Sequence, residues 1–340
     1  MTKISFHNLP EIEKINIIQQ VSNIQGLAPF AVEKDWWVVQ TLAVIFEMQV
    51  GEHLVFKGGT SLSKAWNLID RFSEDVDLAI DRKFLGFEGR LSKKQITALR
   101  KSANNYISEI FYIELQSEFI KKGFLGLRWE IIKTIESDQD PVIINLYYPH
   151  SIDMPGYILP RVQIEIGCRS LREPFSKQKI TSLITAQFPD AVFSEGLCSI
   201  PTVNPERTFL EKIFLLHEEF SKPKGKIRFE RLSRHLYDVC QLSRTDFAGT
   251  ALHNKELYET IVQHRLKFTK IGDVDYNLHQ PQTINIIPSD SIIEYWKADY
   301  ETMQEQMIYG DSPSFETIIL ELLELQNKIN SLDWRIDIVK

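Results

Sequence analysis

The sequence has few cysteines and no long apolar run. Its three cysteines, Cys168, Cys198 and Cys240, lie far apart and include no Cys-x-x-Cys pair. This spacing excludes a disulfide framework and a zinc site, and it predicts free thiols in a reducing compartment. No stretch approaches the roughly 20 apolar residues of a membrane span, and the polar N-terminus lacks the apolar core of a signal peptide. We therefore expect a cytoplasmic protein that makes no contact with a membrane.

The chain also lacks an excess of positive charge. Its formal net charge is −7, which excludes a protein that coats nucleic acid by bulk electrostatics but permits a local basic groove. Hydrophobic residues make up 43% and charged residues 25% of the 340 positions, values that are ordinary for a globular protein. A chain of this length usually forms two domains.

Two common phosphate-binding motifs are missing. There is no Walker A loop, because no glycine-rich stretch ends in Gly-Lys-Ser/Thr, and there is no G-x-G-x-x-G dinucleotide fingerprint. These absences disfavour a P-loop kinase or GTPase and a Rossmann-type enzyme.

Periodicity divides the chain into an α/β front half and a helical back half. Helical spacing occupies residues 11–21, 32–48 and 93–121, while strand alternation occupies residues 54–56, 76–80, 128–135, 142–148 and 161–166. From Pro205 onward helical patterns dominate, at residues 206–220, 229–242, 254–268, 291–307 and 315–332. We predict an α/β domain with a mixed sheet over residues 1–200 and an α-helical domain over residues 201–340.

A predicted strand, a pair of glycines and a predicted helix follow one another in residues 54–66. Glycines permit a tight turn, and the exposed amides at a helix N-terminus favour an anion such as phosphate. Nearby hydroxyl groups can donate to the same phosphate oxygens. The predicted nucleotide-binding residues of this segment are Lys57, Gly58, Gly59, Thr60, Ser61 and Ser63.

Two aspartates follow on the next predicted strand. Asp75 and Asp77 are two residues apart, so both carboxylates leave the same face of the strand. Paired carboxylates beside a phosphate site are typical ligands of magnesium. Glu165, on another predicted strand, is the candidate third acid of a two-metal site. The alternative for this pair is a hydrated strand end. Asp138 and Asp140 have the same spacing just before a proline, and we expect them to be solvated loop acids.

The stretch Val55–Leu78 resembles nucleotidyltransferase toxins of the AbiEii/AbiGii type, within the polymerase-β-like superfamily. The residues that carry this resemblance are FKGGTSLSKAW and RFSEDVDL. Similar stretches are Glu33–Trp37, Thr208–His217 and His235–Leu242. The resemblance implies a polymerase-β-like fold and a toxin of a toxin–antitoxin or phage-defence pair.

The same resemblance implies a reaction and further site residues. A nucleoside triphosphate (NTP) would be the substrate, Mg²⁺ the cofactor, tRNA or another RNA the acceptor, and an antitoxin a partner. Asp75 and Asp77 match the family's catalytic acids, while Lys212 and Asp238 match its lysine and second aspartate. Lys212 would hold the triphosphate, and Asp238 would either hold Lys212 or take a proton from the acceptor. His235 departs from the family, in which an arginine-aspartate pair is usual.

Other observations leave alternatives open. The segment Lys222–His235 carries six basic residues and one acid, which suits an RNA backbone or a solvated surface equally. Lys34 and Asp35, beside two tryptophans, are secondary candidates for a cleft edge. Alternative functions are nucleotidylation of a small molecule or a protein, and a nucleotide-binding regulator without turnover.

Overall fold

The computed structural model describes residues 4–72, 75–132, 139–153, 159–309 and 311–338. Residues 133–135 of the third predicted strand and Asp138 lie outside these ranges. The described chain forms two compact units, one of residues 1–65 and 72–203 and the other of residues 66–71 and 204–340. The predicted domains were residues 1–200 and 201–340, and the sequence did not predict that the segment 66–71 belongs to the second unit.

The first unit is built on a seven-stranded mixed sheet of order β3-β4-β5-β2-β1-β7-β6. The β2–β5 and β1–β7 pairs are parallel, and the other neighbouring pairs are antiparallel. The predicted α/β fold with a mixed sheet is therefore confirmed. The strands are β1 (Leu54–Lys57), β2 (Asp75–Ile80), β3 (Arg128–Ile132), β4 (Val142–Tyr147), β5 (Arg161–Gly167), β6 (Phe175–Ile180) and β7 (Cys198–Val203).

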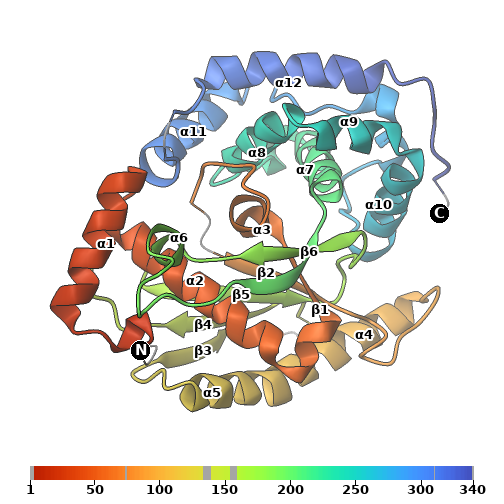
Figure 1. Cartoon of the computed structure of the whole chain (residues 1–340). Helices are drawn as coiled ribbons and strands as arrows, with labels where there is room; N and C mark the ends of the chain where they lie inside the picture. The colour runs from red at the N-terminus through yellow and green to blue at the C-terminus, as the bar shows by residue number, and fades with distance from the viewer. Residues whose placement is uncertain (1–3, 73–74, 133–138, 154–158, 310, 339–340) are drawn as a thin grey trace. The chain divides into compact units, whose positions relative to one another are not determined.

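Helices pack around this sheet, and α2 contacts both β2 and β5 (Figure 1). Helix α2 begins with Pro29, whose fixed φ suits the first helical turn. The long helix predicted over residues 93–121 contains a π-helical turn at its centre. The helices of the unit are η1 (Phe6–Asn8), α1 (Glu11–Gln25), α2 (Pro29–Glu47), η2 (Gln49–His53), α3 (Gly58–Lys64), α4 (Lys93–Tyr106), the π-turn η3 (Ile107–Phe111), α5 (Tyr112–Lys121) and α6 (Leu183–Gln187).

The two central strands β2 and β5 place polar and apolar side chains on opposite faces of the sheet. Val76, Leu78, Ile164 and Ile166 are at most 1% exposed, and burying an aliphatic side chain of this size contributes about 1.5–3 kcal/mol. Asp75, Asp77, Gln163 and Glu165, which alternate with them along the two strands, are partly exposed. A one-residue shift in the register of either strand would point its acidic side chains into the core, so the apolar pattern fixes the register.

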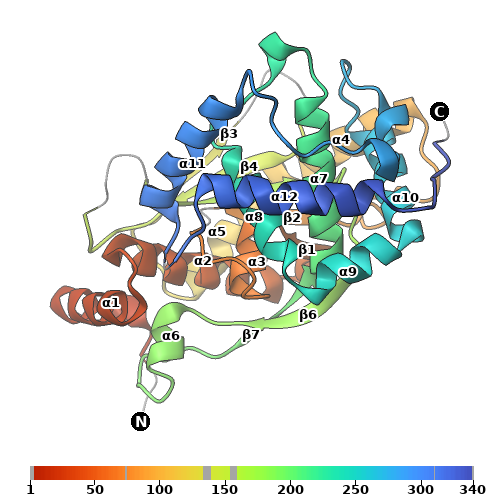
Figure 2. The ribbon, with the colours of Figure 1, turned by 90° about the horizontal axis from the view of Figure 1, so that it is seen from above.

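The second unit is helical and is arranged around α7 (Pro205–Phe220). Helix α7 packs against α8, α9 and α10, and α12 lies along α8 (Figures 1 and 2). The remaining helices are η4 (Lys224–Lys226), α8 (Ser233–Ser243), α9 (Asp246–His253), α10 (Lys255–Phe268), η5 (Tyr276–Leu278), η6 (Pro281–Thr283), α11 (Ile293–Met307) and α12 (Phe315–Asn330).

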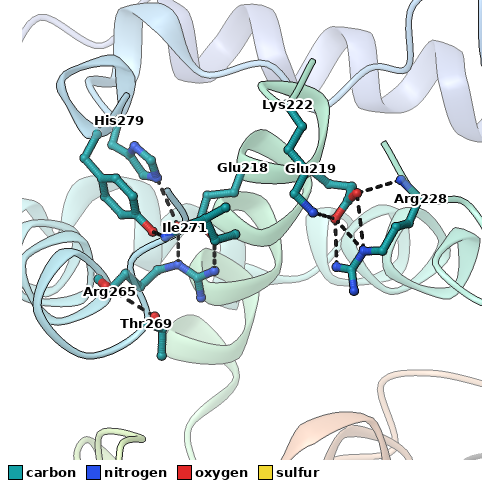
Figure 3. A network of polar contacts seen from close by, with 9 residues as sticks. Glu218, Glu219, Lys222, Arg228, Arg265, Thr269, Ile271 and His279 are labelled. Atoms are coloured by element: carbon teal, nitrogen blue, oxygen red, sulfur yellow. Dashed lines mark hydrogen bonds and ion pairs between the residues drawn. The ribbon is translucent and has the colours of Figure 1, made fainter. Parts of the chain in front are cut away.

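Because α7 is buried on most sides, its charged residues need partners within the unit. Figure 3 shows two of them: Glu218 accepts from Arg265 and His279, and Glu219 accepts from Lys222 and Arg228. These pairs hold α10 and the segment after α7 against the central helix.

The three cysteines are free thiols, as the sequence predicts. In the part of the chain that the structure describes, no helix has both the length and the apolar character to cross a membrane.

Candidate active site

The close approach of one carboxylate requires the first glycine of the turn. Gly58 follows β1 with a φ of +82°, a left-handed conformation that glycine adopts without strain. A Cβ atom at this position would lie 2.1 Å from Oδ2 of Asp77, well inside van der Waals contact. Lys57 and Asp77 are paired on the antiparallel strands β1 and β2, which brings the turn beside the acid. The glycine turn and the Asp75/Asp77 strand therefore form one local structure.

The hydroxyl groups of α3 make different contacts from those predicted. Thr60 Oγ1 donates to the backbone oxygen of Asp75 at 2.6 Å, and Ser61 Oγ donates to that of Gly58 at 2.8 Å. Ser63 Oγ donates to the backbone oxygen of Thr60 at 3.2 Å. Thr60 and Ser61 are also buried. In this structure all three hydroxyls donate to nearby backbone oxygens, as serine and threonine side chains commonly do.

Asp77 and Glu165 lie directly opposite each other on the parallel strands β2 and β5, and Asp75 lies opposite Gln163. Across β2 and β5 the three acids therefore share one face of the sheet. They do not form a preformed metal site, since the residues that the structure describes contain no cluster of three or more side chains that could ligate one metal ion.

The paired aspartates nevertheless suit magnesium. Mg²⁺ is commonly held by one or two carboxylates, with substrate phosphates and waters completing its octahedral shell, so a preformed cage of three side chains is not needed.

Strand β5 supplies a contact that sequence reasoning missed. Gln163 Nε2 donates to Glu165 Oε1 at 2.7 Å, and Arg161 Nη2 donates to Gln163 Oε1 at 3.0 Å. The alternation Arg161-x-Gln163-x-Glu165 could have indicated this row, since residues two apart on a strand lie on the same face. These bonds restrict the rotation of the Glu165 carboxylate.

The second unit brings Lys212 and Asp238 together. Lys212 Nζ, on α7, lies 2.8 Å from Asp238 Oδ2, on α8. The same carboxylate accepts from Arg71 Nε and Nη2, each at 2.7 Å. Lys212 Nζ also lies 3.3 Å from Nδ1 of His235. Sequence reasoning assigned no role to Arg71, although it stands in the quoted stretch RFSEDVDL.

The electrostatics of this cluster keep Asp238 ionised. Burial alone would raise the pKa of its carboxyl, but Arg71 and Lys212 together hold that pKa well below its usual value. A carboxylate with so low a pKa is a poor general base. Of the two roles that the resemblance implied for Asp238, the structure supports the holding of Lys212.

The residues Glu33–Asp35 have structural contacts. Glu33 accepts from the backbone amide of Ser151 at 2.7 Å, and Asp35 accepts from that of Leu183 at 2.7 Å, at the start of α6. Lys34 is 1% exposed and donates to the backbone oxygen of Leu159. The expectation of a cleft edge at Lys34 and Asp35 was wrong, because both side chains are buried and hold loops in place.

Known proteins resemble this chain at the level of family and fold. A family model described as nucleotidyl transferase AbiEii toxin, type IV toxin–antitoxin system, matches residues 41–321. Among curated proteins there is no match. The solved nucleotidyltransferase toxin MenT4 of Mycobacterium tuberculosis H37Rv aligns with a TM-score of 0.53 and 14% identity, over 96% of this chain and 91% of that chain. JHP933 of Helicobacter pylori aligns with a TM-score of 0.41 and 12% identity, over 88% and 91%.

At 14% identity the likeness to MenT4 supports the fold alone. The family model, in contrast, spans most of the chain, including the glycine turn, both aspartates, Lys212 and Asp238. The resemblance seen in the sequence is confirmed: the chain belongs to the AbiEii family of nucleotidyl transferase toxins of type IV toxin–antitoxin systems.

Proposed function

We propose that the chain transfers a nucleotide from an NTP to an RNA acceptor, with tRNA as its substrate and a divalent metal as its cofactor. The observation that carries this proposal is the position of Asp77, whose carboxylate packs against Gly58 and which lies opposite Glu165 on the neighbouring strand. Family membership supplies the reaction class.

Asp75 and Asp77 would hold Mg²⁺, and the backbone amides of Gly58–Ser61 would contact phosphate oxygens. Bound there, the metal would neutralise charge on the phosphates and promote in-line displacement at the α-phosphorus. Glu165, oriented by Gln163, would accept a hydrogen bond from the attacking hydroxyl of the acceptor. Lys57 lies on the strand that enters the turn and would contribute a positive charge to the same anion.

Lys212 would contact the triphosphate and stabilise the charge that develops on the departing pyrophosphate. Only four positions separate Arg71, which belongs to the Lys212 cluster, from Asp75.

The case for an RNA acceptor rests on the basic segment Lys222–His235. Some of its basic residues have partners within the protein, which reduces the number of candidate phosphate contacts. Lys222 and Arg228 both bind the buried carboxylate of Glu219, so they stabilise the end of α7 (Figure 3). Lys224 and Lys226 are exposed on η4, although Lys226 also contacts Asp273. The candidate phosphate contacts are therefore Lys224 and Lys226.

Replacing Lys224 and Lys226 together with serine should weaken tRNA labelling and leave NTP binding unchanged. Each lost phosphate contact should flatten the slope of log affinity against log salt concentration by roughly one. The measurement is transfer of label from an α-labelled NTP to total tRNA at several salt concentrations. Arg228 is not replaced in this variant, because its loss would remove one of the ion-pair partners of the buried Glu219 carboxylate.

The matched control is the double variant Lys255→Ser and Lys270→Ser, which removes two exposed lysines elsewhere on the same unit. Equal labelling by both double variants and the wild type would mean that η4 is a solvated surface. Labelling of a protein or a small molecule in place of tRNA would overturn the RNA acceptor and retain the nucleotidyltransferase.

A further inference from the structure

The carboxylate of Asp238 is held on both oxygens. Arg71 donates to Oδ1 and Oδ2 from its planar fork, and Lys212 donates to Oδ2. Arg71 is 2% exposed and Asp238 is fully buried. A two-bond arginine–carboxylate pair fixes orientation as well as charge. The Asp238 carboxylate therefore cannot rotate without breaking at least one short bond.

This fixed carboxylate determines where the Lys212 ammonium lies. A lysine ammonium has three N–H donors; here one faces Asp238 Oδ2 and one faces His235 Nδ1. Burial and the charge of Lys212 lower the pKa of His235 well below its usual value, which leaves the imidazole neutral and able to accept. Two of the three donors thus have protein acceptors with fixed positions.

Arg71 is itself anchored to the helical unit. Its neighbour Asp70 accepts from the backbone amide of Tyr309 at 3.0 Å, and the Asp70 amide donates to the hydroxyl of Tyr237 at 3.2 Å. Arg71 also forms an antiparallel bridge with Ile308. Tyr237 directly precedes Asp238 on α8, so the segment 66–71 is bound to α8 at two successive residues.

We propose that Arg71 is a positioning residue for nucleotide transfer: it clamps Asp238, and the clamped carboxylate aims Lys212 at the triphosphate. The proposal rests on the function proposed above for Lys212. It predicts that Arg71 contributes nothing to triphosphate binding once Lys212 is absent. An arginine that merely stabilised the fold would have the same effect with or without Lys212.

The test compares Arg71→Lys and Arg71→Met with Lys212→Met and with the double variant Arg71→Met/Lys212→Met. NTP affinity is measured by calorimetry in the presence of magnesium. KM is measured as well, and kcat is calculated per folded molecule, with the folded fraction taken from thermal unfolding. Arg71→Lys keeps the charge but loses the two-bond fork. We expect it to lower kcat about 10- to 100-fold, the effect of a misplaced catalytic group.

The matched control is Arg265→Lys. Arg265 is a mostly buried arginine that makes a comparable pair with Glu218 in the same helical unit (Figure 3). The Arg265→Lys variant should lose thermal stability without a change in NTP affinity or in kcat per folded molecule.

The double variant decides between the two roles. If it binds NTP as Lys212→Met alone does, Arg71 acts through Lys212, because residues that act as a unit are non-additive. If Arg71→Met weakens binding by the same factor in both backgrounds, the positioning role is wrong. Wild-type kinetics for Arg71→Lys would also overturn it while leaving the proposed function intact. Wild-type affinity in Lys212→Met would instead overturn the triphosphate contact proposed above for Lys212, on which the positioning role depends. Should Arg71→Met not fold, Arg71→Lys with and without Lys212→Met gives the same comparison.

Discussion

Replacing Lys212 with methionine should lower kcat/KM for nucleotide transfer on the order of 10²- to 10³-fold, the usual effect of removing one donor that stabilises transition-state charge. Methionine preserves the apolar stem of lysine and removes the ammonium. Asp238 keeps both bonds to Arg71 in this variant, so its buried charge stays paired and the unit should fold. In a bacterial host the variant should also relieve growth inhibition at equal protein level.

Lys34→Met is the control for this experiment. Lys34 is another buried lysine, but it contacts the backbone oxygen of Leu159 and lies over the ring of Phe72. We expect it to lower the melting temperature without lowering kcat per folded molecule. Full toxicity and full transfer by Lys212→Met would remove Lys212 from the active site.

Replacing Asp77 with asparagine should abolish the dependence of NTP binding on magnesium and lower transfer by at least about 10³-fold. The loss of one ionic metal ligand costs several kcal/mol of charge stabilisation, and each 1.36 kcal/mol is a factor of ten in rate. Asparagine has nearly the same shape as aspartate, so the close packing of this side chain against Gly58 should be preserved.

Calorimetry with magnesium and with a chelator measures this effect directly. The wild type should bind NTP more tightly in magnesium, and Asp77→Asn should bind equally in both. Asp81→Asn, just beyond the same strand, is the control, because Asp81 pairs with Arg172 and has no proposed metal contact. A retained magnesium effect in Asp77→Asn would mean that the metal, if bound, lies elsewhere.

Local sequence patterns were sufficient to predict the strands β1 to β5 of the sheet. Strand alternation placed Asp75 and Asp77 on one face of β2, and Glu165 was the candidate acid on another strand. The register between β2 and β5 puts all three on the same face of the sheet. The glycine turn was predicted from residue type, and its reason emerged only with the fold, because the pairing of β1 with β2 brings Asp77 against Gly58.

Long-range contacts account for what the sequence did not reveal. Strands β6 and β7 were missed because β6 is half polar, with Lys177, Gln178 and Lys179 in succession. Arg71 and Asp238 are 167 positions apart, and no pattern within either segment predicts their bond. The hydroxyls of Thr60 and Ser61 donate to backbone oxygens, which the sequence could not indicate, since a hydroxyl near a glycine turn can bind either a ligand or the turn itself.

The central claim is that this protein cleaves an NTP at the α-phosphorus and attaches the nucleotide to an acceptor. The most direct test incubates the purified protein with magnesium, total RNA and an NTP labelled either at the α- or at the γ-phosphate. We predict that the α-label appears in RNA and the γ-label in pyrophosphate, and that Asp77→Asn and Lys212→Met produce neither product. Incorporation of the γ-label into an acceptor, or release of free γ-phosphate, would contradict the claim, because it would mean phosphoryl transfer or hydrolysis in place of nucleotidyl transfer.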